Sequence, residues 1–268
     1  MDNKLSVSVI LPIKTSQTRN FDEYFDKCIA SIKNQQLPIN ELVIVHTSES
    51  GLTKKLESYD FGDLDVKKYL WDSDPNFSSQ VNYGIDKSTS EWISVTEFDD
   101  EYSSIWFKNV KKYIDSYPES EGFLPLVIDV DEKGLFVGFT NEATFAANFS
   151  QEIGILTNDM LHDYQNFQTS GSIFKKSKVV EYGGFKSNVK LTFPYEFLLR
   201  MTYHSLKIMT IPKIGYKHTN LREGSIFWNY KFGEDILDEK QIKFWIDMAK
   251  KEYFFTKERE IKYEPQEN

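Results

Sequence analysis

The first hundred residues alternate between short β-branched runs and segments whose apolar residues recur at helical spacing. Residues 6–11, closed by Pro12, and residues 42–45 are predicted to form buried strands. Residues 21–35 place their apolar side chains three or four positions apart, which predicts an amphipathic helix. A strand, a helix and a strand in succession form a βαβ unit, so we expect parallel strands and a right-handed crossover.

The same alternation continues to residue 117. It predicts strands at 66–70 and 92–96, and helices at 53–59, 77–88 and 103–117. Repeated alternation of this kind is typical of an α/β domain with helices on both faces of a mostly parallel sheet. We therefore expect a Rossmann-like layer structure over this half of the chain.

The second half of the chain is less regular. A hairpin is predicted at 123–130 and 135–139, around Glu132-Lys133-Gly134. Further elements are expected as a strand at 170–174, helices at 175–182 and 194–205, a strand at 207–212, and a charged helix at 234–256. The simplest interpretation is one domain over 1–232, followed by a C-terminal helical appendage and tail over 233–268.

Composition excludes several classes of protein. The 268 residues include 32 Lys and Arg against 41 Asp and Glu, a net charge of −9, which argues against nucleic acid as a partner. The single cysteine, Cys28, excludes an intramolecular disulfide framework and a metal site built from cysteines. No stretch approaches the roughly 18 apolar residues that span a bilayer, and the start lacks a signal region. We therefore expect a cytoplasmic protein without a transmembrane segment.

An acidic cluster follows the strand predicted at 92–96. Glu97, Asp99, Asp100 and Glu101 lie at its carboxyl end, where open α/β sheets bind ligands. Carboxylates this close repel one another, and a hard divalent cation with oxygen ligands relieves that repulsion. The alternative is an acidic helix start, where Asp and Glu favour the macrodipole. The position at a strand end favours a site for a cation and a diphosphate.

The order of several short motifs resembles the inverting glycosyltransferases of family 2, which have the GT-A fold. The resemblance spans about residues 6–225. It includes the metal motif, usually Asp-x-Asp-Asp, which stands here as Glu97-Phe98-Asp99-Asp100. The other matching segments are residues 9–13, 31–35, 41–45, 82–85, 183–185, 195–200 and 212–218.

The resemblance implies a GT-A-like fold in which residues 1–102 bind a nucleotide-sugar, most often a UDP-sugar, and residues 103–232 bind the acceptor. It implies that Asp99 binds Mn²⁺ or Mg²⁺ and that His218 completes the coordination. Such a metal acts as a Lewis acid on the leaving diphosphate. The residues expected to bind the donor are Pro12, Lys14, Thr47, Asn82, Glu97, Asp99 and Arg222.

Two departures from the family pattern concern the base and the nucleotide. The family usually carries Asp-Asp-Gly-Ser after the second strand, whereas this chain has His46-Thr47-Ser48, so Thr47 is the candidate for the uracil edge. Where the family usually has its catalytic Asp, Phe193 and Pro194 stand. Glu196 is the nearest carboxylate and the candidate general base, which removes the proton of the acceptor hydroxyl. Asp159 and Asp163 are reserve candidates.

The sequence thus predicts a metal-dependent, inverting glycosyltransferase of the hexosyltransferase type. It would move a sugar from a nucleotide-sugar to a hydroxyl of a glycan, a lipid-linked acceptor or a protein. One alternative is a binding module that keeps the fold but has lost the base. A nucleotidyltransferase on a similar fold is disfavoured, because residues 12–17 contain no glycine. The rings of Trp71, Phe77, Tyr195 and Trp228 are candidates for a sugar cleft or for core packing, and the oligomeric state stays open.

Overall fold

The computed structural model describes residues 5–74, 76–142 and 154–262. Its described strands form one mixed sheet in the order β3-β2-β1-β4-β9-β6-β10-β5, with β7 beside β6 and β8 beside β10. The strands are β1 (Leu5–Ile13), β2 (Ile39–His46), β3 (Val66–Leu70), β4 (Trp92–Val95), β5 (Glu101–Tyr102), β6 (Gly122–Val130), β7 (Phe136–Thr140), β8 (Gly154–Leu156), β9 (Ile173–Lys175) and β10 (Ile208–Thr219).

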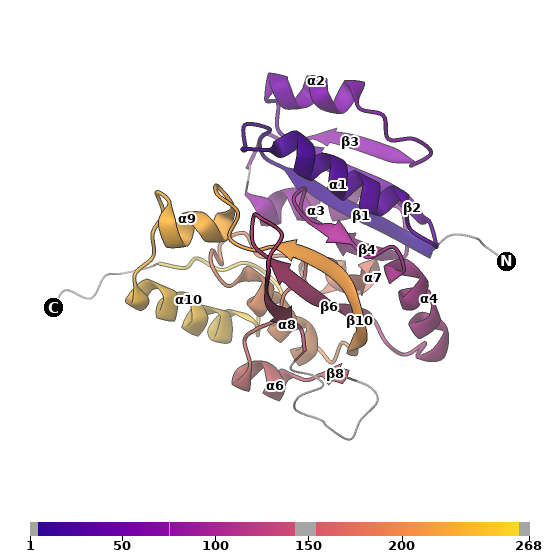
Figure 1. Ribbon diagram of the computed structural model, residues 1–268. Helices are drawn as coiled ribbons and strands as arrows, with labels where there is room; N and C mark the ends of the chain where they lie inside the picture. The colour runs from indigo at the N-terminus through magenta and orange to yellow at the C-terminus, as the bar shows by residue number, and fades with distance from the viewer. Residues whose placement is uncertain (1–4, 75, 143–153, 263–268) are drawn as a thin grey trace.

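Helices cover both faces of this sheet (Figure 1). They are α1 (Phe21–Lys33), α2 (Ser50–Ser58), α3 (Phe77–Lys87), α4 (Trp106–Ser116), α6 (Asn158–Asp163), α7 (Lys176–Glu181), α8 (Phe193–Tyr203), α9 (Ile226–Phe232) and α10 (Glu239–Glu252). No helix within the described ranges combines the length and the apolar content needed to cross a bilayer.

Six strands of the sheet run in the same direction. β1 pairs in parallel with β2 and β4, and β2 pairs in parallel with β3. The short β9 opposes both β4 and β6, so β4 and β6 share one direction, and β10 runs parallel to β6. The expectation of a mostly parallel sheet flanked by helices is confirmed.

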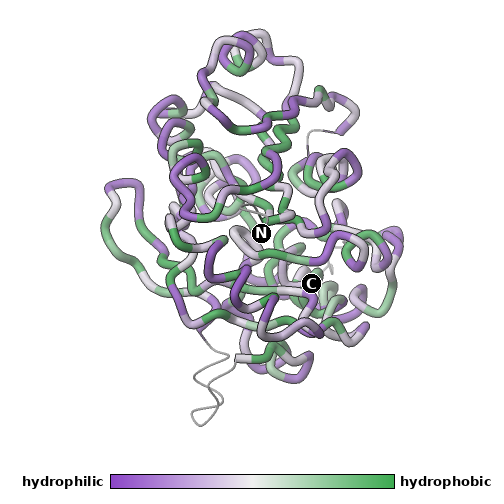
Figure 2. The backbone as a smooth tube through the Cα atoms, turned by 90° about the vertical axis from the view of Figure 1, so that its right-hand side faces the viewer, coloured by the Kyte–Doolittle hydropathy of each residue, from purple (hydrophilic) through white to green (hydrophobic). Residues whose placement is uncertain are grey.

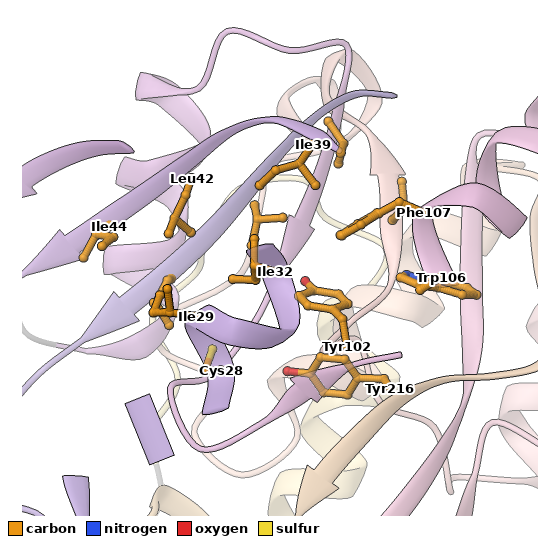
Figure 3. Packing of buried hydrophobic residues seen from close by; sticks show 14 of the residues in the cluster. Cys28, Ile29, Ile32, Ile39, Leu42, Ile44, Tyr102, Trp106, Phe107 and Tyr216 are labelled. Carbon is orange, nitrogen blue, oxygen red and sulfur yellow. The ribbon is translucent and has the colours of Figure 1, made fainter. Parts of the chain in front are cut away.

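The sheet separates two hydrophobic cores. Because side chains alternate along a strand, Leu11 and Leu42 face one core while Ile10 and Val43 face the other. The first core receives buried side chains from α1, α2 and α4, and the second from α3, α7, α8 and α10. Figure 3 shows part of the first core, in which Cys28 of α1 lies among apolar side chains. Hydrophobic segments run through the interior of the molecule, and hydrophilic ones gather on its outer turns (Figure 2).

The C-terminal segment docks on the main body. α10 packs beside α8, with Trp245 and Ala249 buried (Figure 1). The hydroxyl of Thr192, before α8, donates a hydrogen bond to the carbonyl of Trp245 at 2.8 Å. Gly183 lies so close to the chain after α10 that an added Cβ would stand 1.8 Å from the carbonyl oxygen of Thr256. The appendage predicted over 233–268 therefore shares a core with the rest, and the domain boundary at residue 232 stays a prediction.

The predicted elements up to β4 agree with the structure within a few residues, but four short elements of its described part were not predicted. These are β5, β8, α6 and α9. The strand expected at 207–212 continues as β10 to Thr219, with register shifts on both sides of Ile214. Asn20, a residue type that often caps helices, adopts a left-handed conformation before α1 and makes no side-chain cap bond.

Candidate functional site

A cavity of 350 Å³ lies at the carboxyl ends of β1 and β4. Pro12 and Lys14 line it from the end of β1, Glu97 and Asp99 from the loop after β4, and Arg222 from the loop after β10. These five residues were all predicted to contact the nucleotide-sugar. The parallel sheet brings them together because the carboxyl ends of neighbouring parallel strands open at one edge.

Asp99 and Arg222 form a buried ion pair in this cavity. The guanidinium Nε of Arg222 lies 2.5 Å from Oδ2 of Asp99, and its plane lies over the ring of Phe98 at 4.7 Å. The other oxygen, Oδ1, is buried without a hydrogen-bond partner among the described residues. Burial and the neighbouring Asp100 raise the pKa of Asp99, although Arg222 opposes the shift. The unpartnered Oδ1 is therefore a free acceptor for a cation.

The next carboxylate, Asp100, holds the end of β10. It accepts a hydrogen bond from the backbone N–H of Thr219 at 2.8 Å and lies 3.0 Å from Nδ1 of His218. Burial alone would lower the pKa of His218, but the Asp100 carboxylate raises it to about 10. The carboxylate of Asp100, from the loop after β4, thus contacts the imidazole of His218 at the end of β10.

Glu97 completes a compact group of possible metal ligands. One ligand atom from each of Glu97, Asp100 and His218 lies within 4.8 Å of the others. Burial, followed by the charges of Asp100 and Asp99, raises the pKa of Glu97 to about 7. A divalent cation would remove that repulsion, so the donor set of carboxylates and one imidazole fits Mn²⁺ or Mg²⁺.

The candidate ligands are grouped differently from the predicted metal set, and the role of Asp99 in binding a cation stays a prediction. The sequence paired Asp99 with His218, but the structure groups His218 with Glu97 and Asp100 while Asp99 is bonded to Arg222. The physical reason is the turn after β4, which places adjacent carboxylates in different surroundings. The family motif alone does not show which of its carboxylates contacts His218 and which contacts Arg222.

A second cavity, of 220 Å³, adjoins the first and shares Phe77, Glu97 and Phe193 with it. Polar side chains dominate its remaining lining, and they come from β6, β7, β10 and the loop before β9. They are Asp129, Thr140, Asn166, Gln168, Thr169, Ser170, His218 and Asn220. Ser170 donates a hydrogen bond to Oε1 of Glu97 at 3.1 Å, which links this wall to the acidic motif.

Two predicted donor-binding residues do not line either cavity. The hydroxyl of Thr47 donates a hydrogen bond to the carbonyl of Lys14 at 2.7 Å, so Thr47 contacts a residue that lines the first cavity. The amide of Asn82 is engaged on both sides by the backbone of Phe185, at 2.7 and 2.8 Å. Asn82 therefore holds the Gly183-Gly184-Phe185 turn, and its contact with the nucleotide stays a prediction.

The structure does not place Glu196 where an acceptor hydroxyl can reach it. Its side chain is fully buried in α8 and lines neither cavity. Arg200 donates from Nε and Nη2 to its two oxygens at 2.9 and 3.0 Å, and Lys186 approaches to 2.9 Å. Arg200 and Lys186 in turn donate to the carbonyls of Gly184 and Glu252. Glu196 thus anchors a buried ion cluster at the start of α8, and its catalytic role stays a prediction that this burial does not favour.

The reserve carboxylates Asp159 and Asp163 lie in α6 and line neither cavity. Among the candidate rings, Phe77 lines both cavities, whereas the buried Tyr195 donates its hydroxyl to the carbonyl of Leu161. Trp71 stacks on Tyr83 at 4.4 Å. Trp228 lies 6.2 Å from the ring of Phe232.

Several lining residues were not found from the sequence. Tyr230 and Asp235 reach the first cavity from α9 and the loop after it. Lys190 lines the same cavity, and Asp129 and Gln168 line the second. Asp129 is a charged residue near the end of a predicted strand, but the sequence alone does not link that strand to the site.

Residues 8–135 match the model of the family described as Glycosyl transferase family 2. A search of curated proteins finds no match. Among solved structures, the S. aureus TarS fragment 1–349 in complex with UDP-GlcNAc is similar at 17% identity, with a TM-score of 0.64 over 84% of this chain and 61% of that one. The same fragment in complex with UDP gives 16% identity, a TM-score of 0.61, and coverage of 80% and 60%.

The chain spans about three fifths of the length of these TarS fragments. At this identity, the likeness establishes the fold, with its mostly parallel sheet and flanking helices. The family match covers β1 to β6 and so includes the acidic motif at Glu97–Asp100. Residues 8–135 thus match the family 2 glycosyltransferase model, and the chain has the GT-A fold of the similar solved structures.

Proposed function

We propose that the chain is a metal-dependent, inverting glycosyltransferase that takes a UDP-sugar as donor and a hydroxyl group as acceptor. The observation that carries the proposal is the first cavity, where Lys14, Lys190 and Arg222 stand beside the carboxylates of Glu97 and Asp99. Cations attract the diphosphate of a nucleotide-sugar, and carboxylates hold the divalent cation that accompanies it. The TarS fragments bind UDP and UDP-GlcNAc on the same fold, which supports this donor class.

The acidic residues with His218 and the basic residues have different proposed roles in the site. Glu97, Asp99, Asp100 and His218 supply the oxygen and nitrogen donors for Mn²⁺ or Mg²⁺, and the cation when bound acts as a Lewis acid on the leaving diphosphate. Arg222 would donate to a phosphate oxygen when a bound cation holds Asp99. Lys14 and Thr47 border the end of β1, where the nucleoside would lie.

Calorimetry and thermal unfolding test the donor site directly. UDP and UDP-GlcNAc should bind the full chain in Mn²⁺ and raise its Tm, because a ligand that binds only the folded state stabilises it. EDTA should remove most of this effect. Binding that is equally tight in EDTA would contradict the role of the cation, and no binding of either compound would contradict the donor class.

A binding module without transfer is the second candidate. Phe193 stands at the start of α8, where the family usually has acidic residues, and Glu196 is locked in ion pairs. This alternative predicts UDP binding without release of UDP from UDP-GlcNAc. The acceptor is proposed to be a glycan, a lipid-linked compound or a protein, and transfer assays with acceptors of each class test this. A cytoplasmic location is also part of the proposal, and cell fractionation tests it.

A further inference from the structure

The second cavity holds a carboxylate with an uncommitted oxygen. We propose that Asp129 is the base that accepts the proton of the acceptor hydroxyl, and that the second cavity binds this acceptor as an uncharged, hydroxyl-rich group. The inference rests on the proposed transferase function. It assigns to β6 the role that the family usually places at the start of α8.

The environment of Asp129 fixes its orientation. Asp129 is only 7% exposed, and its Oδ2 accepts a hydrogen bond from the hydroxyl of Thr140 on β7 at 2.6 Å. Oδ1 has no hydrogen-bond partner among the described residues, and Asp129 lines the cavity. One oxygen is therefore held in place while the other stays available to a hydroxyl in the cavity.

The second cavity adjoins the first, which is the proposed donor site, at the candidate metal group. Asp129 pairs in register with His218, the imidazole of the candidate metal group, across β6 and β10. Glu97 lines both cavities, so the metal group lies at their junction. An acceptor bound beside Asp129 would thus approach a sugar whose diphosphate lies among the cations of the first cavity.

The lining of the second cavity indicates the chemical class of the acceptor. No Lys or Arg is among the described residues that line it, in contrast to the first cavity. Its groups are hydroxyls, amides, aromatic rings, the imidazole of His218 and two carboxylates, of Glu97 and Asp129, which would repel an anion. Nε2 of Gln168 is buried without a hydrogen-bond partner among the described residues, so one donor is free for a ligand oxygen. This mixture favours a neutral sugar over a phosphate or a carboxylate.

The proposed reaction is a single displacement at the anomeric carbon of the donor sugar. The acceptor oxygen attacks the anomeric carbon of the donor sugar, and a C–O bond forms while its proton passes to Oδ1 of Asp129. The bond between the anomeric carbon and the diphosphate oxygen breaks, and its electron pair leaves with UDP. A base placed in this way contributes about 10²- to 10⁴-fold to the rate.

The other carboxylates are committed elsewhere. Glu97 and Asp100 belong to the metal group, and Asp99 is paired with Arg222. Glu196 is sealed in its ion cluster. Asp235 is exposed and lines only the first cavity. Apart from Glu97, Asp129 is the one carboxylate in the described lining of the second cavity.

The test measures release of UDP from UDP-GlcNAc in Mn²⁺, with water as the acceptor, for the full chain. Asp129→Asn keeps the shape and the bond from Thr140 but loses the basic oxygen. It should lower kcat by about 10²- to 10⁴-fold, with the Kd for UDP and the Tm as in wild type. Asp129→Glu should recover part of the rate. Asp131→Asn is the matched control, since Asp131 caps the hairpin turn after β6 and lines neither cavity.

Each outcome decides a different point. Wild-type turnover in Asp129→Asn would overturn the assignment while leaving the transferase function intact. Equal losses in Asp129→Asn and Asp131→Asn, each with a lowered Tm, would show a structural role for this strand end and overturn the assignment too. A wild-type chain that binds UDP but releases none from UDP-GlcNAc would contradict the transferase function itself, and with it any base.

Discussion

Arg222 and Asp99 form an ion pair at 2.5 Å inside the cavity that is expected to receive a nucleotide diphosphate. Both side chains are almost completely buried, with 7% of Arg222 and 4% of Asp99 exposed. The guanidinium therefore occupies one oxygen of the motif carboxylate, and the unpartnered Oδ1 is the oxygen left over. A cation and a diphosphate entering together would satisfy both groups, because the cation takes the carboxylate and the phosphate takes the guanidinium.

Replacement of Arg222 distinguishes binding of the diphosphate from binding of the cation. Arg222→Ala should weaken UDP binding in Mn²⁺ by about 10- to 100-fold, the effect of losing one charge-assisted hydrogen bond. Mn²⁺ binding alone should be unimpaired, because Asp99 loses its competitor. Calorimetry with Mn²⁺ and then with UDP measures both affinities. An unchanged affinity for UDP would show that Arg222 is only a structural partner of Asp99.

Glu196 should matter for stability rather than catalysis. Glu196→Gln leaves the buried Arg200 and Lys186 without their carboxylate and should lower the free energy of unfolding by about 3–5 kcal/mol. Glu181→Gln is the matched control, since its pair with Lys178 lies at the surface and should contribute little to stability. Urea unfolding measures both variants. A fully stable Glu196→Gln protein with lost turnover would restore Glu196 as the base.

Glu41 should make stability depend on pH in the acid range. Burial would raise its pKa, but hydrogen bonds from Lys67, Ser8 and Thr89 lower it from 4.5 to about 2. The lowered pKa stabilises the folded chain fully above about pH 4.5, and this stabilisation disappears as the pH falls through 2. Glu41→Gln should cost about 1–3 kcal/mol at pH 7.

The difference between wild type and Glu41→Gln should narrow as the pH falls from 4.5 toward 2. Urea unfolding at several pH values provides the comparison. A difference that is constant over this range would show that the carboxylate charge contributes nothing, and that the loss at pH 7 comes from packing alone.

Gly183 tests the docking of the C-terminal segment. Its φ of +92° and the 1.8 Å approach of an added Cβ to the carbonyl of Thr256 leave no room for a side chain. Gly134→Ala is the matched control, because its φ of +78° carries the strain without a nearby atom and should cost about 1–2 kcal/mol. Gly183→Ala should cost clearly more in urea unfolding. Equal costs would mean that residues after α10 do not hold this turn in solution.

The sequence predicted the N-terminal half of the fold well, because buried parallel strands and amphipathic helices leave strong periodic patterns. β10 was predicted too short, since Pro212 in a strand usually marks its end. The structure instead continues β10 past Pro212, with register shifts on both sides of Ile214. α9 and β8 are too short for periodicity to distinguish them from loops.

The order of the motifs predicted that the acidic motif and His218 lie in one site, but not how the other residues pack around it. The resemblance placed His218 beside the acidic motif, and the structure brings them together. The partner of Glu196 at i+4, Arg200, was visible in the sequence, but its burial beside Lys186 depends on how α8 packs. Asp129 reaches the site through the pairing of β6 with β10, which no local pattern reveals.

The most direct test of the central claim is turnover of UDP-GlcNAc by wild type and by Asp99→Asn in Mn²⁺. The control is Asp115→Asn, whose carboxylate pairs with Lys111 on the surface of α4. We expect wild type and the control to release UDP at the same rate, EDTA to abolish the release, and Asp99→Asn to be slower by about 100-fold or more, since a catalytic metal stabilises the transition state by several kcal/mol. Equal, metal-independent rates for wild type and Asp99→Asn would contradict the account.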